Sequence, residues 1–408
     1  MRCCHIFRKE IQLKDYQIED IEFTEKNHYV LIADEMGLGK TFAALGVVKK
    51  LNLYPCLIIV PKSLKTNWYR EIKRMDHYQT TDIVQGNDHV IAIRGGYFAK
   101  SYTIVNYDSH KLIAKMPKCR SIIMDEIHYL KNYKAKRTII IKKYVRNSGA
   151  SHVMGLSGTP ILNKGTEIVS VVNSIHANLI NLESFLNNYC VEGKWGGWLV
   201  SSSKVTDIHS MLIRRGIMIR HTKDVLDLPL KLRKRIALEK PVGYENYVVS
   251  QHRKYGDITM AALQKVRMFL EIQKVPHIVS YTEDLVDETN QKVIVFTNYK
   301  EPTELIAKQL NTKYIHSDIL GDPRAKIFSD FENDPNMKIL VITIQTGNVG
   351  LNLTHAKHVV FAGYSYSPAS MMQAEDRIHR IGQDQNVTIH YTYASETVDE
   401  DAVDLLKI

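Results

Sequence analysis

The chain has 408 residues, 44% of them apolar, and a formal net charge of +10. This length suffices for two well-packed domains and is too great for one ordinary hydrophobic core. The positive charge favours a polyanionic partner such as nucleic acid without proving one, and the absence of any apolar run near ~20 residues argues against a membrane-spanning helix.

The five cysteines are Cys3, Cys4, Cys56, Cys119 and Cys190. They form neither C-x-x-C pairs nor a cluster with histidine at metal-ligand spacing. The N-terminus also lacks the apolar core of a signal peptide. We therefore expect reduced thiols in a soluble, intracellular protein.

The first predicted element is an amphipathic stretch over residues 13–23, which contains Tyr16 and Gln17. The amide of Gln17 can both donate and accept, which suits the edge of an adenine while Tyr16 packs nearby. A solvent-exposed glutamine is the alternative.

A strand, a glycine-containing loop and a helix are predicted in succession at residues 29–32, 34–41 and 42–51. A loop that cradles phosphate requires this context. The strict G-x-x-x-x-G-K-[ST] pattern is not met, because Asp34 occupies the place of its first glycine. A plain glycine turn is the alternative reading of residues 34–41, which we call the phosphate loop.

Within the phosphate loop, Gly37 and Gly39 allow a tight turn that aims backbone N–H groups at a polyphosphate. Lys40 would reach the β- and γ-phosphates of a nucleotide, and Thr41 would hold magnesium. The residues assigned to nucleotide binding here are Met36, Gly37, Leu38, Gly39, Lys40 and Thr41.

Further apolar runs at residues 56–61, 102–106 and 122–124 are typical of parallel strands covered on both faces. Loops at the carboxyl ends of such strands carry ligands. A Lys/Ser/Thr loop follows the first run and can hold a nucleic-acid backbone. We assign such contacts to Pro61, Lys62, Ser63, Asn106 and Tyr107.

Adjacent carboxylates, Asp125 and Glu126, follow the third of these runs. Such a pair is costly at a strand end unless a cation or a proton occupies the site. Together with Lys40, the pair indicates magnesium held by Asp125 and an attacking water oriented and deprotonated by Glu126. A solvated pair before a helix is the alternative.

The strand at residues 153–156 and the turn at 157–163 end the first predicted domain, residues 1–163. Residues 164–286 show weaker strand signals, which indicates a mainly helical insertion and connector. Basic residues are densest at 214–235, where they line a nucleic-acid groove or form a solvated linker.

A second α/β domain is predicted at residues 287–408, with strands at 292–298, 338–343, 358–362 and 387–391. It has no phosphate loop of its own. We assign further nucleic-acid contacts to Thr297, Asn298, Thr346 and Gly347, and further nucleotide contacts to Gly350 and Gln373.

Arg377 and Arg380 lie within residues 373–383. Three positions apart, they would project from one face of a helix and could meet a nucleotide held by the other domain. Arginine suits this role because it is always charged and binds phosphate in a planar fork. Two solvent-exposed arginines on an amphipathic helix are the alternative.

Taken together, these segments closely resemble the Swi/Snf-type ATPases of helicase superfamily two, over residues 13–404. Residues 34–41 match the family's first motif and account for Asp34. Residues 125–128 resemble the second motif, with Ile127 where alanine or glycine is usual. Residues 156–160 match the third motif, and residues 373–383 are similar to the sixth.

The resemblance implies two RecA-like lobes with parallel sheets, ATP and magnesium in the cleft between them, and DNA bound across both. It assigns Gln17 to the adenine and makes Arg377 and Arg380 arginine fingers, so that hydrolysis requires lobe closure. The protein is expected to act as a monomeric, DNA-dependent ATPase with little sequence preference.

Two positions depart from the family pattern. Residues 346–353 resemble the fifth motif but have Asn348 where a second glycine is common, and Tyr366 stands where many relatives have tryptophan. Residues 274–277 are similar to the HepA-related branch, whose members reanneal or migrate branched DNA. The sequence therefore favours remodelling of branched DNA, with protein displacement on duplex DNA or a non-translocating, ATP-gated clamp as alternatives.

Overall fold

The computed structural model describes residues 12–84, 100–158, 164–193, 197–255, 259–319, 321–347, 353–365 and 367–406. The chain divides into two units, Met1–Leu226 and Asp227–Ile408. The predicted insertion and connector, residues 164–286, is divided between these units. Within the described ranges, none of the helices has the length and apolarity needed to cross a membrane.

The first unit is built on a seven-stranded sheet in the order β3-β4-β2-β5-β6-β1-β9, with every neighbouring pair parallel. Its strands are β1 (Tyr29–Ile32), β2 (Cys56–Val60), β3 (Thr81–Ile83), β4 (Tyr102–Asn106), β5 (Ser121–Asp125), β6 (His152–Leu156) and β9 (Met218–Ile219). A separate antiparallel pair is formed by β7 (Cys190–Glu192) and β8 (Trp198–Val200).

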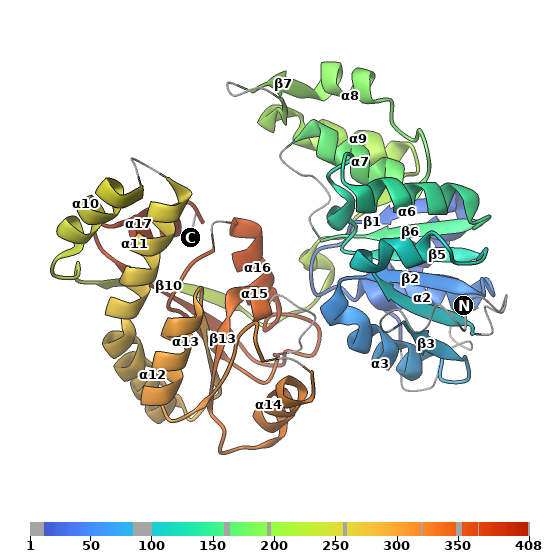
Figure 1. The fold of residues 1–408 in the computed structure, drawn as a ribbon. Coiled ribbons are helices and arrows are strands. Elements are labelled where there is room, and N and C mark those ends of the chain that lie inside the picture. The colour runs from blue at the N-terminus through green and yellow to red at the C-terminus, as the bar shows by residue number, and fades with distance from the viewer. Residues whose placement is uncertain are drawn as a thin grey trace. The chain divides into compact units, whose positions relative to one another are not determined.

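Helices cover both faces of this sheet, and Figure 1 shows α6 and α7 on one side of it with α2 and α3 on the other. The helices are α1 (Asp15–Asn27), α2 (Lys40–Lys50), α3 (Lys65–Met75), α5 (His110–Ile113), α6 (Lys136–Asn147), α7 (Gly165–Ile175), α8 (Leu182–Tyr189) and α9 (Val205–Arg214). Short 3-10 turns include η3 (Ile127–Leu130) and η5 (Lys223–Val225). Because both faces are covered, β2 and β4 are buried along their whole length.

The second unit has a six-stranded parallel sheet in the order β10-β15-β14-β11-β13-β12. Its strands are β10 (Lys231–Leu238), β11 (Val293–Thr297), β12 (Lys313–Ile315), β13 (Ile339–Thr343), β14 (His358–Phe361) and β15 (Val387–Ala394). Its helices are α10 (Tyr244–Tyr255), α11 (Met260–Gln273), α12 (Val275–Thr289), α13 (Lys300–Gln309), α14 (Gly321–Asn333), α15 (Ile344–Gly347), α16 (Pro368–Asp376) and α17 (Val398–Asp404).

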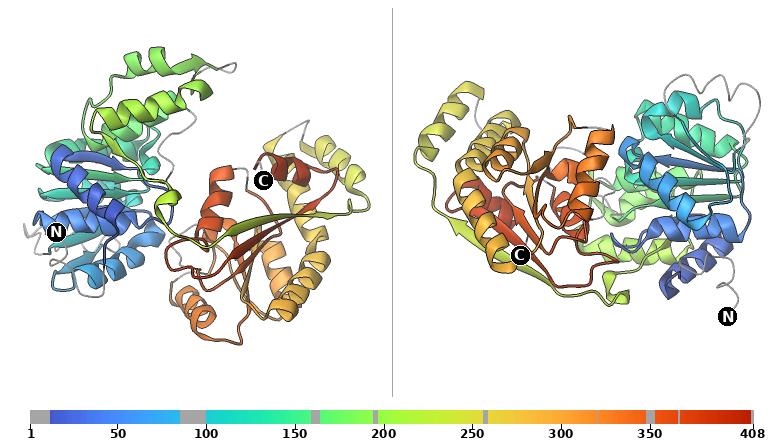
Figure 2. Two further views of the ribbon diagram at one scale, coloured as in Figure 1. Left: turned by 180° about the vertical axis from the view of Figure 1, so that it is seen from behind. Right: turned by 90° about the horizontal axis from the view of Figure 1, so that it is seen from below.

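Two parallel α/β sheets confirm the predicted fold class. The prediction missed four strands of these sheets, β3, β9, β10 and β12. The longest of them, β10, reads Lys-Leu-Arg-Lys-Arg-Ile-Ala-Leu and is largely exposed, since it lies at the edge of its sheet beside β15 (Figure 2). Charged residues are common on edge strands, so β10 lacks the apolar run that marks a central strand.

Candidate functional site

The phosphate loop joins β1 to α2, as predicted. Gly37 and Gly39 both have positive φ, 88° and 75°, and Gly39 is the residue immediately before α2. A Cβ atom at Gly39 would lie 2.6 Å from Nε2 of Gln17. The loop therefore requires glycine at this position for both its backbone conformation and its close packing.

Lys40 is held against the backbone of its own loop. Its Nζ donates to the carbonyl oxygens of Asp34, at 2.7 Å, and Glu35, at 3.1 Å. The ammonium group is thus placed at the start of α2, where the helix N-terminus also favours an anion. This geometry fits the predicted role of Lys40 in binding phosphate.

Tyr16 and Gln17 contact the other end of the loop. The hydroxyl of Tyr16 donates to the carbonyl of Leu38 at 2.9 Å, and Nε2 of Gln17 donates to the same oxygen at 3.0 Å. Oε1 of Gln17 accepts from the backbone N–H of Lys14, and the side chain is only 4% exposed. Both residues support the loop in this structure, and their contact with adenine stays a prediction.

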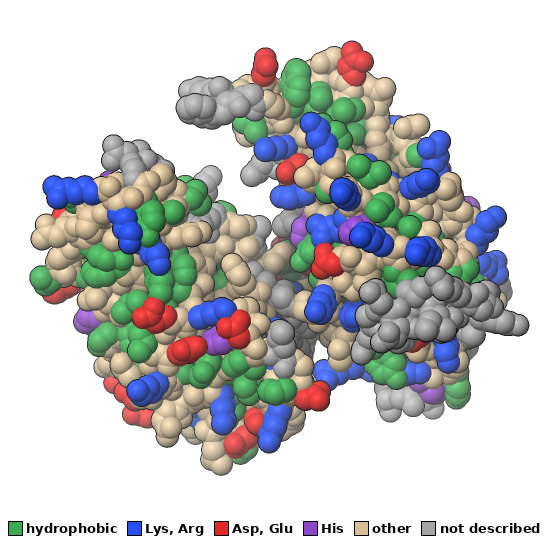
Figure 3. Space-filling model, in the orientation of Figure 1, with side chains coloured by type: hydrophobic (Ala, Val, Ile, Leu, Met, Phe, Trp, Pro, Cys, Tyr) green, Lys and Arg blue, Asp and Glu red, His purple; other side chains and the backbone are tan. Residues whose placement is uncertain are grey.

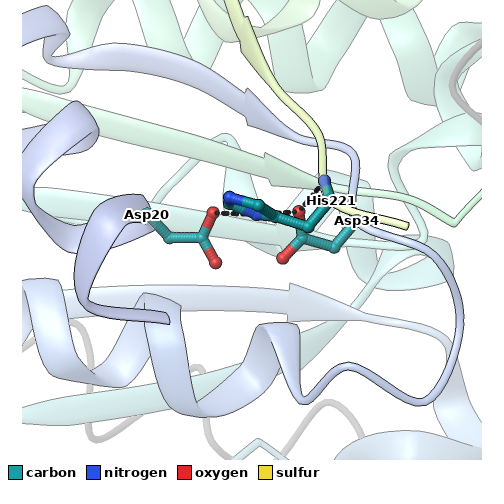
Figure 4. Close-up of side chains that lie close together, drawn as sticks. All are labelled: Asp20, Asp34 and His221. Carbon is teal, nitrogen blue, oxygen red and sulfur yellow. Dashed lines mark hydrogen bonds and ion pairs between the residues drawn. The ribbon is translucent and has the colours of Figure 1, made fainter. Parts of the chain in front are cut away.

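Asp34, which replaces the first glycine of the usual pattern, is wholly buried and meets a residue 187 positions away. Nδ1 of His221 lies 3.0 Å from Oδ1 of Asp34 and 3.3 Å from Oδ1 of Asp20. Figure 4 shows the imidazole between the two carboxylates. Hydrogen bonds to Asp20 and Asp34 raise the pKa of His221 to about 10, and burial raises the pKa of Asp20 to about 7.

The second predicted motif begins at the end of β5, where Asp125 is oriented by two donors. Trp68 Nε1 donates to its Oδ2 at 2.8 Å, and the backbone N–H of Glu126 donates to its Oδ1 at 3.0 Å. Burial and then the charge of Glu126 raise the pKa of Asp125 to about 6, while Trp68 and the charge of Lys40 oppose the rise. Lys40 and Asp125 thus belong to one electrostatic site, and the Thr41 hydroxyl and the Asp125 carboxylate offer the hard oxygen ligands that magnesium prefers.

Glu126 adopts a left-handed backbone conformation with φ of 50°. Its Oε2 lies 3.3 Å from Nδ1 of His128, which follows it on η3. The hydroxyl of Tyr107 donates to the carbonyl of Asp125 at 2.8 Å, and its ring stacks on Tyr129. These contacts fix the turn that carries the two acidic residues.

The residues predicted to contact nucleic acid differ in exposure. Lys62 and Ser63 are exposed on the loop after β2, and Asn298 is half-buried. Buried side chains belong to Pro61, Asn106, Tyr107, Thr297 and Thr346, and Gly347 is buried as well. Tyr107 is 1% exposed and supports Asp125, so in this structure it serves the acidic turn rather than a surface.

The prediction that Arg377 and Arg380 share one helix face is wrong. The helix α16 ends at Asp376, and Arg377 is its C-terminal cap, followed by turns. The carbonyls that a continuing helix would use next bind other partners: the N–H of Leu353 donates to the carbonyl of Arg377 at 3.0 Å, and Nε2 of Gln383 donates to that of Ile378 at 3.2 Å. Gln373 itself lies on α16 and is half-buried.

A buried carboxylate anchors this arginine-bearing turn. Glu375 accepts from Arg233 Nε and Nη2 at 2.9 and 2.7 Å, and from Lys231 Nζ at 2.7 Å. Burial alone would raise the pKa of Glu375, but these two basic side chains lower it to about 2. The basic strand β10 thus holds α16 in place, and the approach of Arg377 and Arg380 to a nucleotide stays a prediction.

Several predicted positions lie outside the described residues, namely Gly350, Asn348, Tyr366 and residues 159–163. Conversely, sequence reasoning missed Trp68, His128, Asp20 and His221. The only sequence signal for the last two was the acidic residue at position 34, which requires a buried partner once the loop is packed.

Comparisons with known proteins bear on the whole chain. Residues 16–261 match the model of the SNF2-related domain, and residues 273–382 match that of the helicase conserved C-terminal domain. The human DNA annealing helicase and endonuclease ZRANB3 is 29% identical over 426 residues, covering 96% of this chain and 39% of that protein. A Caenorhabditis elegans homolog of the SWI/SNF-related matrix-associated actin-dependent regulator of chromatin subfamily A-like protein 1 is also 29% identical, with 95% and 59% covered.

Among solved structures, the Sulfolobus solfataricus SWI2/SNF2 ATPase core in complex with dsDNA is 21% identical, with a TM-score of 0.47. The match covers 100% of this chain and 93% of that one. The chain spans about two fifths of the human relative and about three fifths of the nematode one.

Proposed function

This chain belongs to the SNF2-related family and is an ATP hydrolase, and we propose that it is a motor that couples ATP hydrolysis to movement on DNA. The observation that carries the proposal is that β1 and β5 end in register on either side of β6, where Ile32 and Asp125 both pair with Leu156, so the phosphate loop and the acidic pair leave the same edge of the sheet. Transfer of a phosphoryl group to water requires a cation that binds the phosphates. It also requires carboxylates that hold a metal ion and orient the attacking water.

The proposed roles follow from this chemistry. The backbone of the phosphate loop and Lys40 would bind the β- and γ-phosphates, and Thr41 and Asp125 would hold magnesium, which would supply positive charge to the phosphates. Glu126 orients the attacking water and accepts its proton. Arg377 and Arg380 add positive charge from the second lobe, so that hydrolysis is fast only when the lobes close.

Support for DNA as the partner comes from charge and exposure. Lys62 and Ser63 are exposed on the loop after β2, and Lys131, Lys134 and Lys136 are exposed after the acidic turn. Figure 3 shows Lys and Arg side chains spread over the visible face of the first unit. Contacts of this kind go to backbone phosphates, so affinity should depend on salt and little on base sequence.

Branched DNA is the substrate that we favour. The human relative is described as a DNA annealing helicase. The similarity of residues 274–277 to that branch is weaker support, because Nζ of Lys274 is buried and binds the carbonyl of Thr392 and the carboxylate of Asp399. Displacement of proteins from duplex DNA and ATP-gated clamping are the competing functions.

The primary test is ATPase activity measured without nucleic acid and with single-stranded, duplex, forked and four-way DNA, and with RNA. We expect strong stimulation by DNA, greatest for the branched forms. Equal rates with and without DNA would count against a motor. Lys40→Ala should lower hydrolysis by at least about a hundredfold and retain DNA binding, whereas the exposed Lys111→Ala should match the parent protein.

Movement is tested separately from hydrolysis. Only a translocating protein strips the third strand from a triplex in an ATP-dependent way, whereas a clamp leaves it bound. Strand release from a four-way junction without displacement of a protein roadblock would support remodelling of branched DNA. The reverse pattern would support the duplex translocase.

A further inference from the structure

Residues 217–223, which we call the latch segment, continue the first sheet past the end of β1. The N–H groups of Leu31, Ala33 and Glu35 donate to the carbonyls of residues 217, 219 and 221, at 2.7, 2.8 and 3.0 Å. The parallel ladder between β1 and β9 therefore extends into the phosphate loop. A segment distant in sequence is thus bonded to the loop's backbone.

Side chains reinforce this backbone pairing at two adjacent loop positions. Asp34 accepts from the backbone N–H of His221 at 2.8 Å and lies against its imidazole. Glu35 accepts from the backbone N–H of Lys223 at 3.0 Å and lies 3.6 Å from the guanidinium of Arg220. The latch segment therefore holds residues 34 and 35 by both backbone and side chain.

The same two loop residues hold Lys40. Their carbonyl oxygens accept from its Nζ at 2.7 and 3.1 Å. A shift of the latch segment would therefore move the two acceptors that fix the ammonium group. The second unit begins at Asp227, four positions after Lys223, so the chain passes to the second unit directly after the latch segment.

The imidazole of His221 balances the charge of two buried carboxylates in this arrangement. Asp20 and Asp34 are both wholly buried, and two buried carboxylates so close together require a cation or a proton between them. Nδ1 of His221 donates to Oδ1 of Asp34 at 3.0 Å and lies 3.3 Å from Oδ1 of Asp20, so that the protonated imidazole faces both carboxylates, while its Nε2 lies 3.1 Å from Glu19 at the protein surface. A donor at the Nδ1 position, rather than at Nε2, is what the buried pair needs.

We propose that His221 is a positioning residue for ATP binding: it clamps the latch segment to the phosphate loop and thereby holds Lys40 in the nucleotide-binding position. This inference rests on ATP hydrolysis and does not depend on the DNA substrate. Without the clamp, the loop spends less time in the competent conformation. The apparent affinity for ATP then falls in proportion to the fraction of molecules in the competent conformation, while kcat changes little.

Two substitutions of His221 separate its two nitrogens. His221→Asn places an amide N–H near the position of Nδ1 and keeps the donor to Asp34, whereas His221→Gln reaches the position of Nε2 and loses it. His209→Asn, a half-buried histidine on α9 of the same unit, is the matched control. The measurements are the KM for ATP and kcat, the affinity for a fluorescent ATP analogue without DNA, and the unfolding temperature.

We expect His221→Gln to raise the KM for ATP about tenfold with kcat nearly unchanged, and His221→Asn to stay within about threefold of the parent protein. The analogue affinity without DNA should follow the KM. Arg220→Gln removes the guanidinium contacts with Ala33 and Glu35 and covers the case in which His221→Gln does not fold. It should raise the KM in the same direction by a smaller factor.

Three outcomes would overturn the proposal. The first is an unchanged KM in His221→Gln or, if that variant does not fold, in Arg220→Gln. The second is equal defects in the Asn and Gln variants together with lower kcat and unfolding temperature, which would indicate a purely structural role. The third concerns a metal, since ligand atoms of Asp20, Asp34 and His221 lie within 4.8 Å of one another. If added Zn²⁺ raised the unfolding temperature of the parent protein and His221→Asn abolished that effect, a bound metal ion rather than a proton would join these residues. Failure of DNA stimulation would leave these results unaffected.

Discussion

Trp68 donates its indole N–H to the carboxylate of Asp125 over 2.8 Å. The side chain of Trp68 comes from α3 and is almost wholly buried, so it fixes the direction of one Asp125 oxygen. Trp68→Phe should keep most of the packing and lose this bond. We expect the Mg²⁺ concentration required for half-maximal ATPase activity to rise about tenfold, as is usual for a lost partner of a metal ligand.

The measurement is ATPase activity against Mg²⁺ concentration at saturating ATP. Trp198→Phe, on the antiparallel pair β7–β8, is the control and should leave the Mg²⁺ requirement unchanged. An unaltered Mg²⁺ dependence in Trp68→Phe, with the protein folded, would argue that the orientation of Asp125 does not govern metal binding.

Gly39→Ala tests the packing of the phosphate loop. The new Cβ would meet Nε2 of Gln17 at 2.6 Å, in a backbone conformation with φ of 75°. Displacing the loop should raise the KM for ATP by about tenfold or more, since small misplacements of a binding group have large effects. Gly149→Ala imposes a similar φ, 72°, but its Cβ would lie 3.7 Å from Lys118. It should cost about 1 kcal/mol of stability and leave the KM unchanged.

The buried carboxylate of Glu375 predicts a pH dependence of stability. Its pKa is lowered from the ordinary 4.5 to about 2, so between these values the folded state binds fewer protons than the unfolded state. The free energy of unfolding therefore rises with pH across this window and is level above it. The full contribution is about 3 kcal/mol, present above pH 4.5 and lost as pH falls to 2.

Urea unfolding of the parent protein and Glu375→Gln at several pH values measures this contribution. The two proteins should differ most above pH 5 and converge near pH 2. The exposed Glu288→Gln, on α12, should follow the parent protein throughout. A difference between Glu375→Gln and the parent protein that did not shrink in acid would mean that the lost stability comes from packing rather than from ionisation.

We predict that substitution of Lys274 lowers the stability of the protein and leaves its preference among DNA substrates unchanged. Its ammonium group is buried with Asp399, and Lys274→Ala would leave that carboxylate without its charge partner. The expected cost is about 3–5 kcal/mol of unfolding free energy in the second unit. Lys265→Ala, exposed on α11, is the control. A stable Lys274→Ala protein with an altered preference among forked, four-way and duplex DNA would instead give Lys274 a direct role in substrate choice.

The central strands and the phosphate loop could be predicted from the sequence because their signals are local. Runs such as residues 56–60 are apolar throughout, since helices cover both faces of the sheet. Edge strands have no such signal: β10 is mostly charged, and β9 has only two residues. Their assignment depends on the neighbours they pair with, which a local pattern does not contain.

The functional residues also differ in whether a local sequence pattern reveals them. Lys40 and Asp125 stand in recognisable motifs, whereas His221 reaches Asp34 across 187 positions of sequence. The spacing of Arg377 and Arg380 fits a helix and a turn equally well. The structure has a turn here, in which donors of Leu353 and Gln383 bind the carbonyls that a continuing helix would need.

The chain leaves the first sheet at Ile219 and enters the second at Lys231, as an edge strand in each. Residues 220–223 are bonded to the phosphate loop, so the tether between the two folded bodies is residues 224–230, with a reach on the order of 25 Å when fully extended. A tether this short keeps the two units at an effective concentration on the order of millimolar, so the closure that we propose would be an intramolecular event at any dilution. Proteolytic cleavage at residues 224–230 would leave both sheets intact and make hydrolysis depend on protein concentration.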